Sequence, residues 1–351
     1  PLMTEWKFEE LCDLFDQAKD CGIHDFTITG GEPMVHKHFM DIVHEIYNRG
    51  MQIGELNTNG YFITQEILDE MKSIGCFPLI KISFDGIGCH DWMRDHKGAE
   101  KKTLDAMALC IKNGFAVKSQ TQVHRKNVET MLPTAKLLND MGVSEMRIIR
   151  TTEVPRWTEN AGDACLTIEE YFEKMLDFAK EYQKSGMEMV IDIWQYLRLF
   201  PKQKEFYISS VAYPKDTYKP TFSGCRGNRG MIAISSSGEV VPCMQMSGYL
   251  MQMGKSFANV HKDKLKDVIT SSPYLDNVCT CIGTIREKNL KCGSCKWFEA
   301  CAGGCRALGL LYSGNAHDFN GSDIMKCYFF ENGWYDRVCD TLDSWENKSR
   351  I

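Results

Sequence analysis

The sequence lacks several features that would place it in common classes of protein. It has no uninterrupted apolar run that approaches the length of a membrane span, and no charged n-region followed by the apolar h-region of a signal peptide. It also lacks a basic excess, because 41 Lys and Arg residues stand against 47 Asp and Glu residues, for a formal net charge of -6. Neutralising phosphates needs such an excess, so we expect neither nucleic acid nor a membrane among its partners.

Length and cysteine content set the next limits. A chain of 351 residues exceeds the usual size of one compact core, so we expect two domains. Its 43% hydrophobic and 25% charged residues are typical of a soluble globular protein. The chain has 16 cysteines and no sign of secretion. These cysteines must mostly stay reduced or bind metal, which predicts a cytoplasmic protein in a reducing, oxygen-poor compartment.

Four cysteines gather near the C-terminus, with two, five and three residues between them: Cys292, Cys295, Cys301 and Cys305. In a chain without signs of secretion, this spacing is typical of metal ligands rather than of disulfides. Thiolates bind soft metals, and the spacing alone suits either zinc or iron–sulfur.

The first half of the chain alternates between strand-like and helix-like segments. A short β-branched run at 25–29 stops at two glycines, and further strand-like runs end at Leu56, Phe84, Val123 and Ile149. Amphipathic helices are expected over 36–48, 64–74, 103–113 and 128–141. Strands that alternate with helices predict a parallel sheet, either doubly wound or wrapped toward a barrel.

Polar residues follow each of these strands, at 30–33, 57–60, 83–86, 121–122 and 150–151. The carboxyl ends of parallel strands carry the functional residues of such folds, and glycine pairs expose backbone that a ligand can approach closely. Together these segments predict one bound ligand at the carboxyl edge of the sheet.

The same segments closely resemble those of the radical S-adenosylmethionine enzymes: Thr29-Gly30-Gly31-Glu32-Pro33, Thr58-Asn59-Gly60, Ser83-Phe84-Asp85-Gly86 and His90-Asp91-Trp92-Met93-Arg94. The resemblance implies an α/β fold with a partial (β/α)6 TIM-like barrel, and S-adenosylmethionine as the cofactor. By resemblance, the methionine amino group of the cofactor is held by Gly30, Gly31, Glu32 and Pro33, with Asn59 as a further cofactor-binding candidate. The candidates for its ribose or carboxylate are Ser83, Asp85 and Gln122. Arg94 would contact the carboxylate or form a structural ion pair.

One part of the family pattern is absent. The family's hallmark is three cysteines with three and two residues between them, which hold the cluster that cleaves the cofactor, and this spacing occurs nowhere in the sequence. Because the chain opens in what resembles the first barrel helix, we expect the first strand and a third four-iron, four-sulfur cluster on a segment before Pro1. The alternative is a degenerate member that has lost catalysis.

The second half resembles the SPASM domain, a small cysteine-rich α+β extension of radical S-adenosylmethionine enzymes that act on peptides and proteins. A hairpin with Gly238 at its turn is expected between Cys225 and Cys243, and the later cysteines complete the pattern. By resemblance the domain holds two auxiliary four-iron, four-sulfur clusters, one on Cys292, Cys295, Cys301 and Cys327 and the other on Cys225, Cys243 and Cys305. The expected domains are a barrel over 1–155, the barrel end and a connection over 156–224, and the SPASM domain over 225–351.

Two such clusters take eight protein ligands, and the pattern supplies seven cysteines, so one position is left. Three outcomes are open for it. Cys279 or Cys281 binds there, or the iron stays open to a substrate sulfur or amide, or the two cysteines are only surface thiols.

The resemblance implies an enzyme in which a 5'-deoxyadenosyl radical abstracts hydrogen from a ribosomally made peptide, leading to a thioether or carbon crosslink. The first alternative is an anaerobic sulfatase-maturing enzyme, which generates formylglycine, and the second is a non-catalytic cluster-binding or electron-carrying homologue. The expected partners are a peptide or protein substrate and a reductant such as flavodoxin or ferredoxin. No residue is assigned as a catalytic acid or base.

Overall fold

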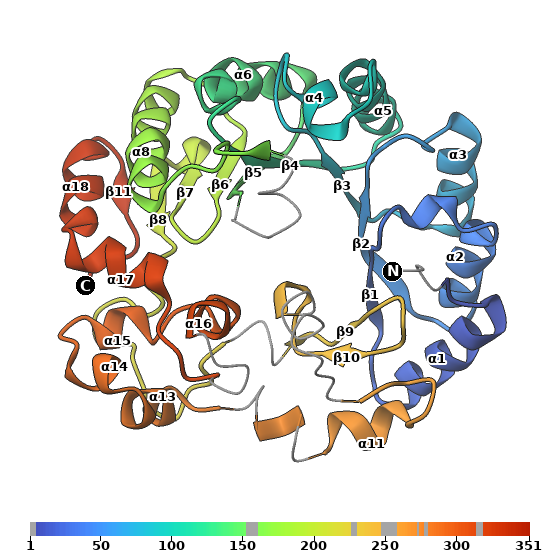
Figure 1. Cartoon of the computed structure of the whole chain (residues 1–351). Helices are drawn as coiled ribbons and strands as arrows, with labels where there is room; N and C mark the ends of the chain where they lie inside the picture. The colour runs from blue at the N-terminus through green and yellow to red at the C-terminus, as the bar shows by residue number, and fades with distance from the viewer. Residues whose placement is uncertain are drawn as a thin grey trace. The chain divides into compact units, whose positions relative to one another are not determined.

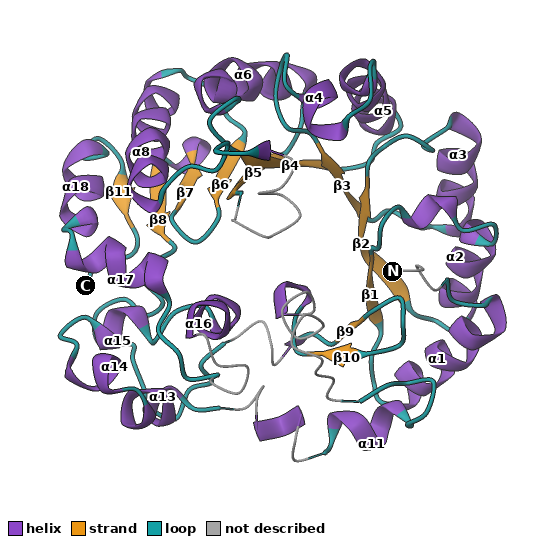
Figure 2. Ribbon diagram, in the orientation of Figure 1, coloured by secondary structure: helices purple, strands orange, loops and turns teal. Residues whose placement is uncertain are grey.

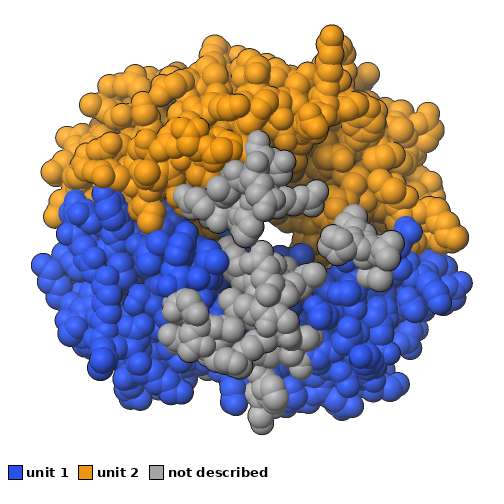
Figure 3. Space-filling model, viewed as in Figure 1, with its two compact units in different colours: residues 1–24, 210–333, 349–351 blue, residues 25–209, 334–348 orange. Residues whose placement is uncertain are grey.

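The computed structural model describes residues 5–151, 161–225, 230–246, 258–271, 274–276, 280–313 and 319–351. Contacts within the chain divide it into two compact units, which Figure 3 colours separately. The unit of residues 25–209 and 334–348 is called the sheet unit below. The unit of residues 1–24, 210–333 and 349–351 is called the cysteine unit.

The sheet unit is built on one nine-stranded sheet, whose strands follow the order β1-β2-β3-β4-β5-β6-β7-β8-β11 (Figure 1). Strands β1 to β6 run parallel to one another, β7 pairs antiparallel with both β6 and β8, and β11 is parallel to β8. The strands are β1 (Asp25–Ile28), β2 (Gln52–Thr58), β3 (Leu79–Ser83), β4 (Val117–Val123), β5 (Glu145–Arg150), β6 (Val190–Ile193), β7 (Leu197–Phe200), β8 (Glu205–Ile208) and β11 (Glu346–Asn347).

Helices connect the strands and cover the outer side of the sheet (Figure 2). They are α2 (Phe39–Asn48), α3 (Gln65–Ile74), α4 (His90–Arg94), α5 (Ala99–Lys112), α6 (Met131–Met141), α8 (Ile168–Lys184) and α18 (Trp334–Thr341). Local sequence sets their ends: the Thr64 hydroxyl accepts a hydrogen bond from the Ile67 amide at 3.4 Å, and Gly75 ends the same helix at φ +81°. The predicted α/β fold with a mainly parallel sheet is confirmed.

The two faces of the sheet differ in chemistry. Ile80 and Ile82 of β3 are fully buried on the outer face, where the helices pack. The inner face carries ion pairs between strands instead. Lys81 pairs with Glu55 at 2.7 Å, and the Arg147 and Asp192 side chains also lie 2.7 Å apart. The alternation of side chains along each strand therefore leaves the inner face polar.

The cysteine unit contains short elements: α1 (Phe8–Asp20), β9 (Ala233–Ile234), β10 (Val240–Val241), α11 (Leu265–Ile269), α13 (Ile282–Lys288), α14 (Leu290–Ser294), α15 (Phe298–Cys301), α16 (Arg306–Ser313) and α17 (Ile324–Glu331). The expected hairpin is confirmed, since β9 and β10 pair antiparallel around Gly238. Helix α1 belongs to this unit because the Gln17 side chain accepts a hydrogen bond from the Leu265 amide at 2.9 Å. Among the described residues, none of the helices is long and apolar enough to cross a membrane.

Candidate functional site

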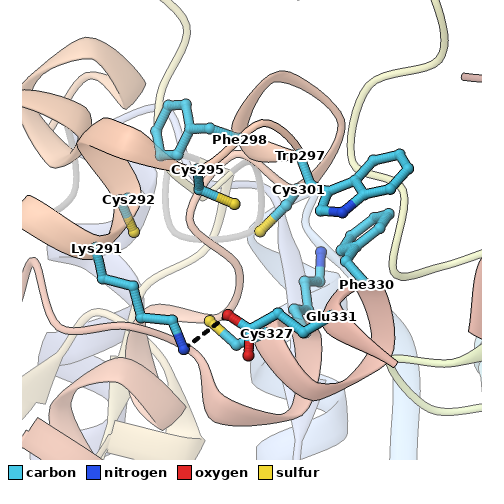
Figure 4. A pocket seen from close by; sticks show the side chains of 10 residues that line it. Lys291, Cys292, Cys295, Trp297, Phe298, Cys301, Cys327, Phe330 and Glu331 are labelled. Carbon is cyan, nitrogen blue, oxygen red and sulfur yellow. Dashed lines mark ion pairs between the residues drawn. The ribbon is translucent and has the colours of Figure 1, made fainter. Parts of the chain in front are cut away.

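Four cysteines of the cysteine unit surround one pocket. Cys292 lies in α14, Cys295 directly follows that helix, Cys301 is the last residue of α15, and Cys327 lies in α17. Their sulfurs point into a common space (Figure 4). The pocket contains about 330 Å³ of space outside the protein atoms, part of it open to solvent. This four-cysteine pocket is lined by Lys291, Cys292, Cys295, Trp297, Phe298, Cys301, Lys326, Cys327, Phe330 and Glu331.

The walls of the four-cysteine pocket are apolar and its rim is charged. Trp297 stacks on Phe330 with ring centroids 5.5 Å apart, and Phe298 is buried in an apolar cluster beneath the cysteines. At the rim, the exposed Lys291 and Glu331 side chains form an ion pair at 2.9 Å. Apolar side chains around the pocket limit the access of water to a group bound there.

Burial acts strongly on the thiols of this pocket. It raises the pKa of Cys301 to about 12 and the pKa of Cys327 to about 11, because a thiolate is poorly solvated there. The pKa of Cys292 is also raised, first by burial, while the Arg306 guanidinium acts in the opposite direction. Thiols in such surroundings stay protonated unless a metal replaces the proton.

Lys326 is a buried cation in the same pocket. Its side chain is only 8% exposed and lines the pocket, and its ammonium forms no ion pair with a carboxylate of the described residues. Burying an uncompensated ammonium is unfavourable, so this lysine favours an anionic occupant. An iron–sulfur cluster bound by four thiolates carries net negative charge, and the residues of the pocket therefore fit such a group.

Three further cysteines form a second group, called the three-cysteine group: Cys225, Cys243 and Cys305. Cys243 follows β10, Cys305 precedes α16, and both pack on a small apolar cluster that includes Val241 and Leu310. Burial raises the pKa of Cys243, and the neighbouring Cys225 thiol adds to this shift. Burial likewise raises the pKa of Cys305 to about 11, with Cys243 among the contributing charges. The apolar cluster thus brings Cys243 and Cys305 together, and the sequence pattern adds Cys225 to the group.

The two candidates for the remaining ligand differ in what the structure describes. The backbone of Cys281 forms an isolated antiparallel β-bridge with Ser223, which lies two residues before Cys225. The Cys281 thiol donates to the Thr221 carbonyl at 3.6 Å. Cys279 lies outside the described residues. Among the residues that are described, no three His, Cys, Asp or Glu side chains are arranged to hold a single metal ion. The ligation predicted for the seven patterned cysteines, and for either of these two, stays a prediction.

At the carboxyl edge of the sheet, the structure brings the first two predicted segments together through Glu32. One Glu32 carboxylate oxygen accepts hydrogen bonds from the Thr58 hydroxyl at 2.8 Å and the Met34 amide at 3.2 Å. The other accepts from the Asn59 amide at 2.7 Å. Gly30 and Gly31 leave their backbone exposed beside it, before Pro33 opens a short 3-10 helix. Glu32 thus links the end of β1 to the end of β2.

Asp85 takes a different place from the one expected for a ligand contact. It is fully buried, and its carboxylate pairs with Arg94 at 2.8 Å and with the His90 ring at 3.2 Å. The backbone amide of Gln122 also donates to this carboxylate, at 3.1 Å. Burial alone would raise the pKa of Asp85, but His90, Arg94 and the Gln122 amide together lower it below its ordinary value. The ion pair is one of the two roles predicted for Arg94, and the cofactor contact stays a prediction.

Ser83 and Gln122 have free side chains on the inner face of the sheet. Neither side chain has a hydrogen-bond partner among the described residues. Their strand register places both on one face, because Ser83 pairs with Gln120 and Gln122 follows two residues later. The Oδ1 atom of Asn57 shares this face, through its pairing with Lys81, and is buried without a partner in the described part of the chain.

Sequence reasoning missed two residues at this edge. Asn127 is fully buried, and its side chain donates to the Asp85 carbonyl at 2.7 Å and the Gln122 carbonyl at 2.8 Å. It therefore fixes the ends of β3 and β4 together. An isolated Asn after a strand gives no signal for this role. Asn57 did belong to the polar segment expected over 57–60, but it lies within β2, and only the strand register shows that it faces inward.

Two family models match the chain. The Radical SAM superfamily model matches residues 3–138, and the model of the SPASM iron–sulfur cluster-binding domain matches residues 225–305. The chain therefore contains a radical SAM domain over residues 3–138 and a SPASM domain over residues 225–305, which confirms the resemblance. The radical SAM domain identifies it as an enzyme.

Its relatives are distant but match over most of their length. The chain is 24% identical to the AdoMet-dependent heme synthase of Methanosarcina barkeri, over 88% of this chain and 84% of that protein. It is 26% identical to the PqqA peptide cyclase of Granulibacter bethesdensis, over 89% of this chain and 77% of that protein.

Solved structures share the fold. SuiB from Streptococcus suis, bound to S-adenosylmethionine, matches with a TM-score of 0.65 at 15% identity, covering 90% of this chain and 69% of that one. The enzyme anSMEcpe, bound to AdoMet and the Cp18Cys peptide, matches with a TM-score of 0.67 at 16% identity, covering 96% and 91%. At this identity the likeness establishes the fold alone.

Proposed function

We propose that this enzyme uses S-adenosylmethionine to modify a ribosomally made peptide, through a thioether or carbon crosslink. The observation that carries the proposal is the pocket lined by Cys292, Cys295, Cys301 and Cys327, beside which Cys243 and Cys305 pack on a second apolar cluster. The non-catalytic alternative is not favoured, because the chain matches the radical SAM superfamily model.

The residues that would hold metal are Cys292, Cys295, Cys301 and Cys327 for one four-iron, four-sulfur cluster, and Cys225, Cys243 and Cys305 for a second. When bound, such clusters supply one-electron transfer, and S-adenosylmethionine supplies the 5'-deoxyadenosyl radical that removes hydrogen from the substrate. The chain's own contribution at the four-cysteine pocket is a dry wall of Trp297 and Phe330. A reductant such as flavodoxin or ferredoxin would deliver the electrons.

The residues that would bind the cofactor lie at the carboxyl edge of the sheet. The Oε2 atom of the anchored Glu32 carboxylate accepts one hydrogen bond and so can accept a second from the amino group of the cofactor, beside the exposed backbone of Gly30 and Gly31. Ser83 and Gln122 offer a hydroxyl and an amide on the inner face for the ribose or the carboxylate. Asp85, being engaged by Arg94 and His90, would orient this edge.

Two observations support a peptide substrate: the relatives of the chain, and the number of cysteines available to ligate the second cluster. PqqA peptide cyclases are among the relatives, and SuiB and anSMEcpe have been solved with peptides bound. A three-cysteine group also leaves one cluster position for Cys279, Cys281 or a substrate atom. The heme synthases, at comparable identity and coverage, favour a heme precursor as a second candidate substrate. Sulfatase maturation is a third candidate, because anSMEcpe shares the fold.

The first test uses the chain of residues 1–351, reconstituted anaerobically. About eight irons per chain, with matching sulfide, are expected for two clusters in this sequence, whereas zinc in place of iron would overturn the assignment. The Cys279→Ala and Cys281→Ala variants decide the last position. A loss of iron or a changed spectrum in one variant identifies a protein ligand, and no change in either favours an open iron.

The second test separates the substrates. The enzyme, expressed from its own gene so that any segment before Pro1 is included and then reconstituted, is incubated with S-adenosylmethionine, a reductant and one candidate substrate at a time. The candidates are a precursor peptide encoded beside its gene, a Cys- or Ser-containing sulfatase peptide, and a heme precursor. Mass spectrometry of the precursor peptide is expected to show loss of a hydrogen pair per crosslink. Conversion of the sulfatase peptide to formylglycine, or of the heme precursor alone, would contradict the proposal.

A further inference from the structure

Asp323 contacts the backbone next to both cysteine sets. It is only 1% exposed and lies directly before α17, the helix that carries Cys327. One carboxylate oxygen accepts hydrogen bonds from the amides of Met325 at 3.0 Å and Lys326 at 3.2 Å, which caps the helix. The other oxygen accepts from the amide of Cys305 at 2.8 Å.

The chain around Cys305 is shaped to let Asp323 approach. Gly304 has φ +75°, and a Cβ atom at this position would lie 2.4 Å from the Cβ of Asp323, so only glycine fits without movement. The buried Arg306 guanidinium donates to the Phe319 carbonyl at 2.9 Å and the Gly321 carbonyl at 3.0 Å, and also to the Gly303 carbonyl. The turn before Cys305 and the loop before Asp323 are thereby held together.

The main chain of Asp323 is also bonded to the four-cysteine pocket. The Cys327 amide donates to the Asp323 carbonyl at 2.9 Å in the first turn of α17. Asp323 is therefore bonded directly to one member of the four-cysteine pocket and, through its carboxylate, to one member of the three-cysteine group.

We propose that Asp323 is a positioning residue shared by two metal sites, because one carboxylate fixes the backbone that presents Cys327 to one site and Cys305 to the other. The proposal rests on the proposed function, since it takes the two cysteine sets to be cluster ligands. It implies that one substitution at Asp323 can disturb both sites.

Substitution by asparagine separates the two halves of this role. The side chain of the Asp323→Asn variant has one acceptor oxygen, which satisfies two amides if it caps α17 and only one if it faces Cys305. The capping orientation is therefore favoured, and the amide of Cys305 then faces a second donor. Asp323→Asn should spare the four-cysteine pocket and disturb the three-cysteine group, whereas Asp323→Ala should disturb both.

A matched control is available on the four-cysteine pocket. Asn289 caps α14 in the same manner, with its side-chain oxygen accepting from the Cys292 amide at 3.1 Å. Its amide donates to the Asn320 carbonyl at 2.8 Å, and within the described part of the chain it has no bond to the three-cysteine group. Asn289→Ala should therefore disturb only the four-cysteine pocket. Reference spectra for each site come from Cys301→Ala and Cys305→Ala.

The experiment measures iron and sulfide per chain, together with the electron paramagnetic resonance spectrum of each reduced, reconstituted variant. We expect Asp323→Asn to lose or alter only the signal that Cys305→Ala removes, and Asp323→Ala to alter both signals. Wild-type signals in both Asp323 variants, or an Asp323→Asn change confined to the four-cysteine signal, would overturn the inference. Failure of the proposed function is distinct, because the wild-type protein itself would then bind no iron.

Discussion

Three of the four sulfurs in the four-cysteine pocket come from residues 292–301, whereas the free polar side chains at the carboxyl edge of the sheet come from three strands within 57–122. In the pocket, short helices place residues that are close in the sequence around one space, so the spacing of the cysteines indicates which of them lie together. At the sheet edge, each side chain is placed by the register of its strand and by what its neighbours already bind. A site built from residues close in the sequence can thus be predicted from their spacing. A site whose residues are placed by the register of separate strands cannot.

The largest expected effect tests the local site. Cys301→Ala should remove the cluster proposed for the four-cysteine pocket and lower iron from about eight to about four per chain, because a four-iron cluster held by three thiolates in a dry pocket is poorly retained. Cys165→Ala is the matched control, since Cys165 belongs to neither cysteine set. Iron and sulfide analysis after anaerobic reconstitution measures the change.

An unchanged iron content in Cys301→Ala would break the comparison, because the pocket would then not be a ligand site at all. An equal loss in Cys165→Ala would show that iron content reports general damage rather than ligation.

The sequence predicted that Cys292, Cys295, Cys301 and Cys327 lie together, and they line one pocket, while their binding of a cluster stays a prediction. It also predicted that the polar segments 30–33 and 57–60 meet at the carboxyl edge of the sheet, and Glu32 joins them there. It did not predict Asp323 or Lys326, which act through burial and through hydrogen bonds to distant backbone. Nor did it predict that Asp85 is engaged by Arg94 and His90 rather than left free toward a ligand. An ion pair with a residue of another element occupies the carboxylate, and the spacing of residues along the sequence does not show such a pair.

The next effect concerns the register-made site. Asp85→Ala should lower the free energy of unfolding by about 2–3 kcal/mol, because it removes a buried carboxylate and leaves Arg94, His90 and the Gln122 amide without their partner. Asp69→Ala is the control, since Asp69 pairs with Lys72 on the surface at 2.7 Å and such pairs contribute little. Urea unfolding followed by circular dichroism compares the midpoints.

The same pair of proteins gives a pH test. The pKa of Asp85 lies below its ordinary value of 3.8 in the folded protein, so the carboxylate contributes stability above that value and loses it as pH falls through the folded pKa. The stability difference between wild type and Asp85→Ala should therefore be full at pH 7 and shrink below about pH 4. A difference that grows on acidification would contradict the assigned ion pair.

A smaller effect is expected for cofactor affinity. Ser83→Ala should weaken S-adenosylmethionine binding by about five- to tenfold, near 1 kcal/mol, because it removes one hydroxyl from the inner face of the sheet. Ser73→Ala is the control, since that exposed hydroxyl donates to the Glu70 carbonyl within α3. Equilibrium dialysis measures both. Equal affinities in wild type and Ser83→Ala would place the cofactor away from β3.

The smallest expected effect leaves metal content, fold and affinity intact and changes only a reduction potential. Lys326→Met keeps the length of the buried side chain and removes its charge, so the cluster proposed for the four-cysteine pocket should become harder to reduce and its potential more negative. Lys291→Met is the control in the same pocket, because Lys291 is about half exposed and paired with Glu331, and water screens its charge. Potentiometric titration followed by electron paramagnetic resonance separates the two clusters. A larger shift for Lys291→Met, or a shift confined to the other cluster, would mean that the buried Lys326 ammonium does not stabilise an anionic cluster in this pocket. The spacing of the four cysteines would then be sufficient to explain the site.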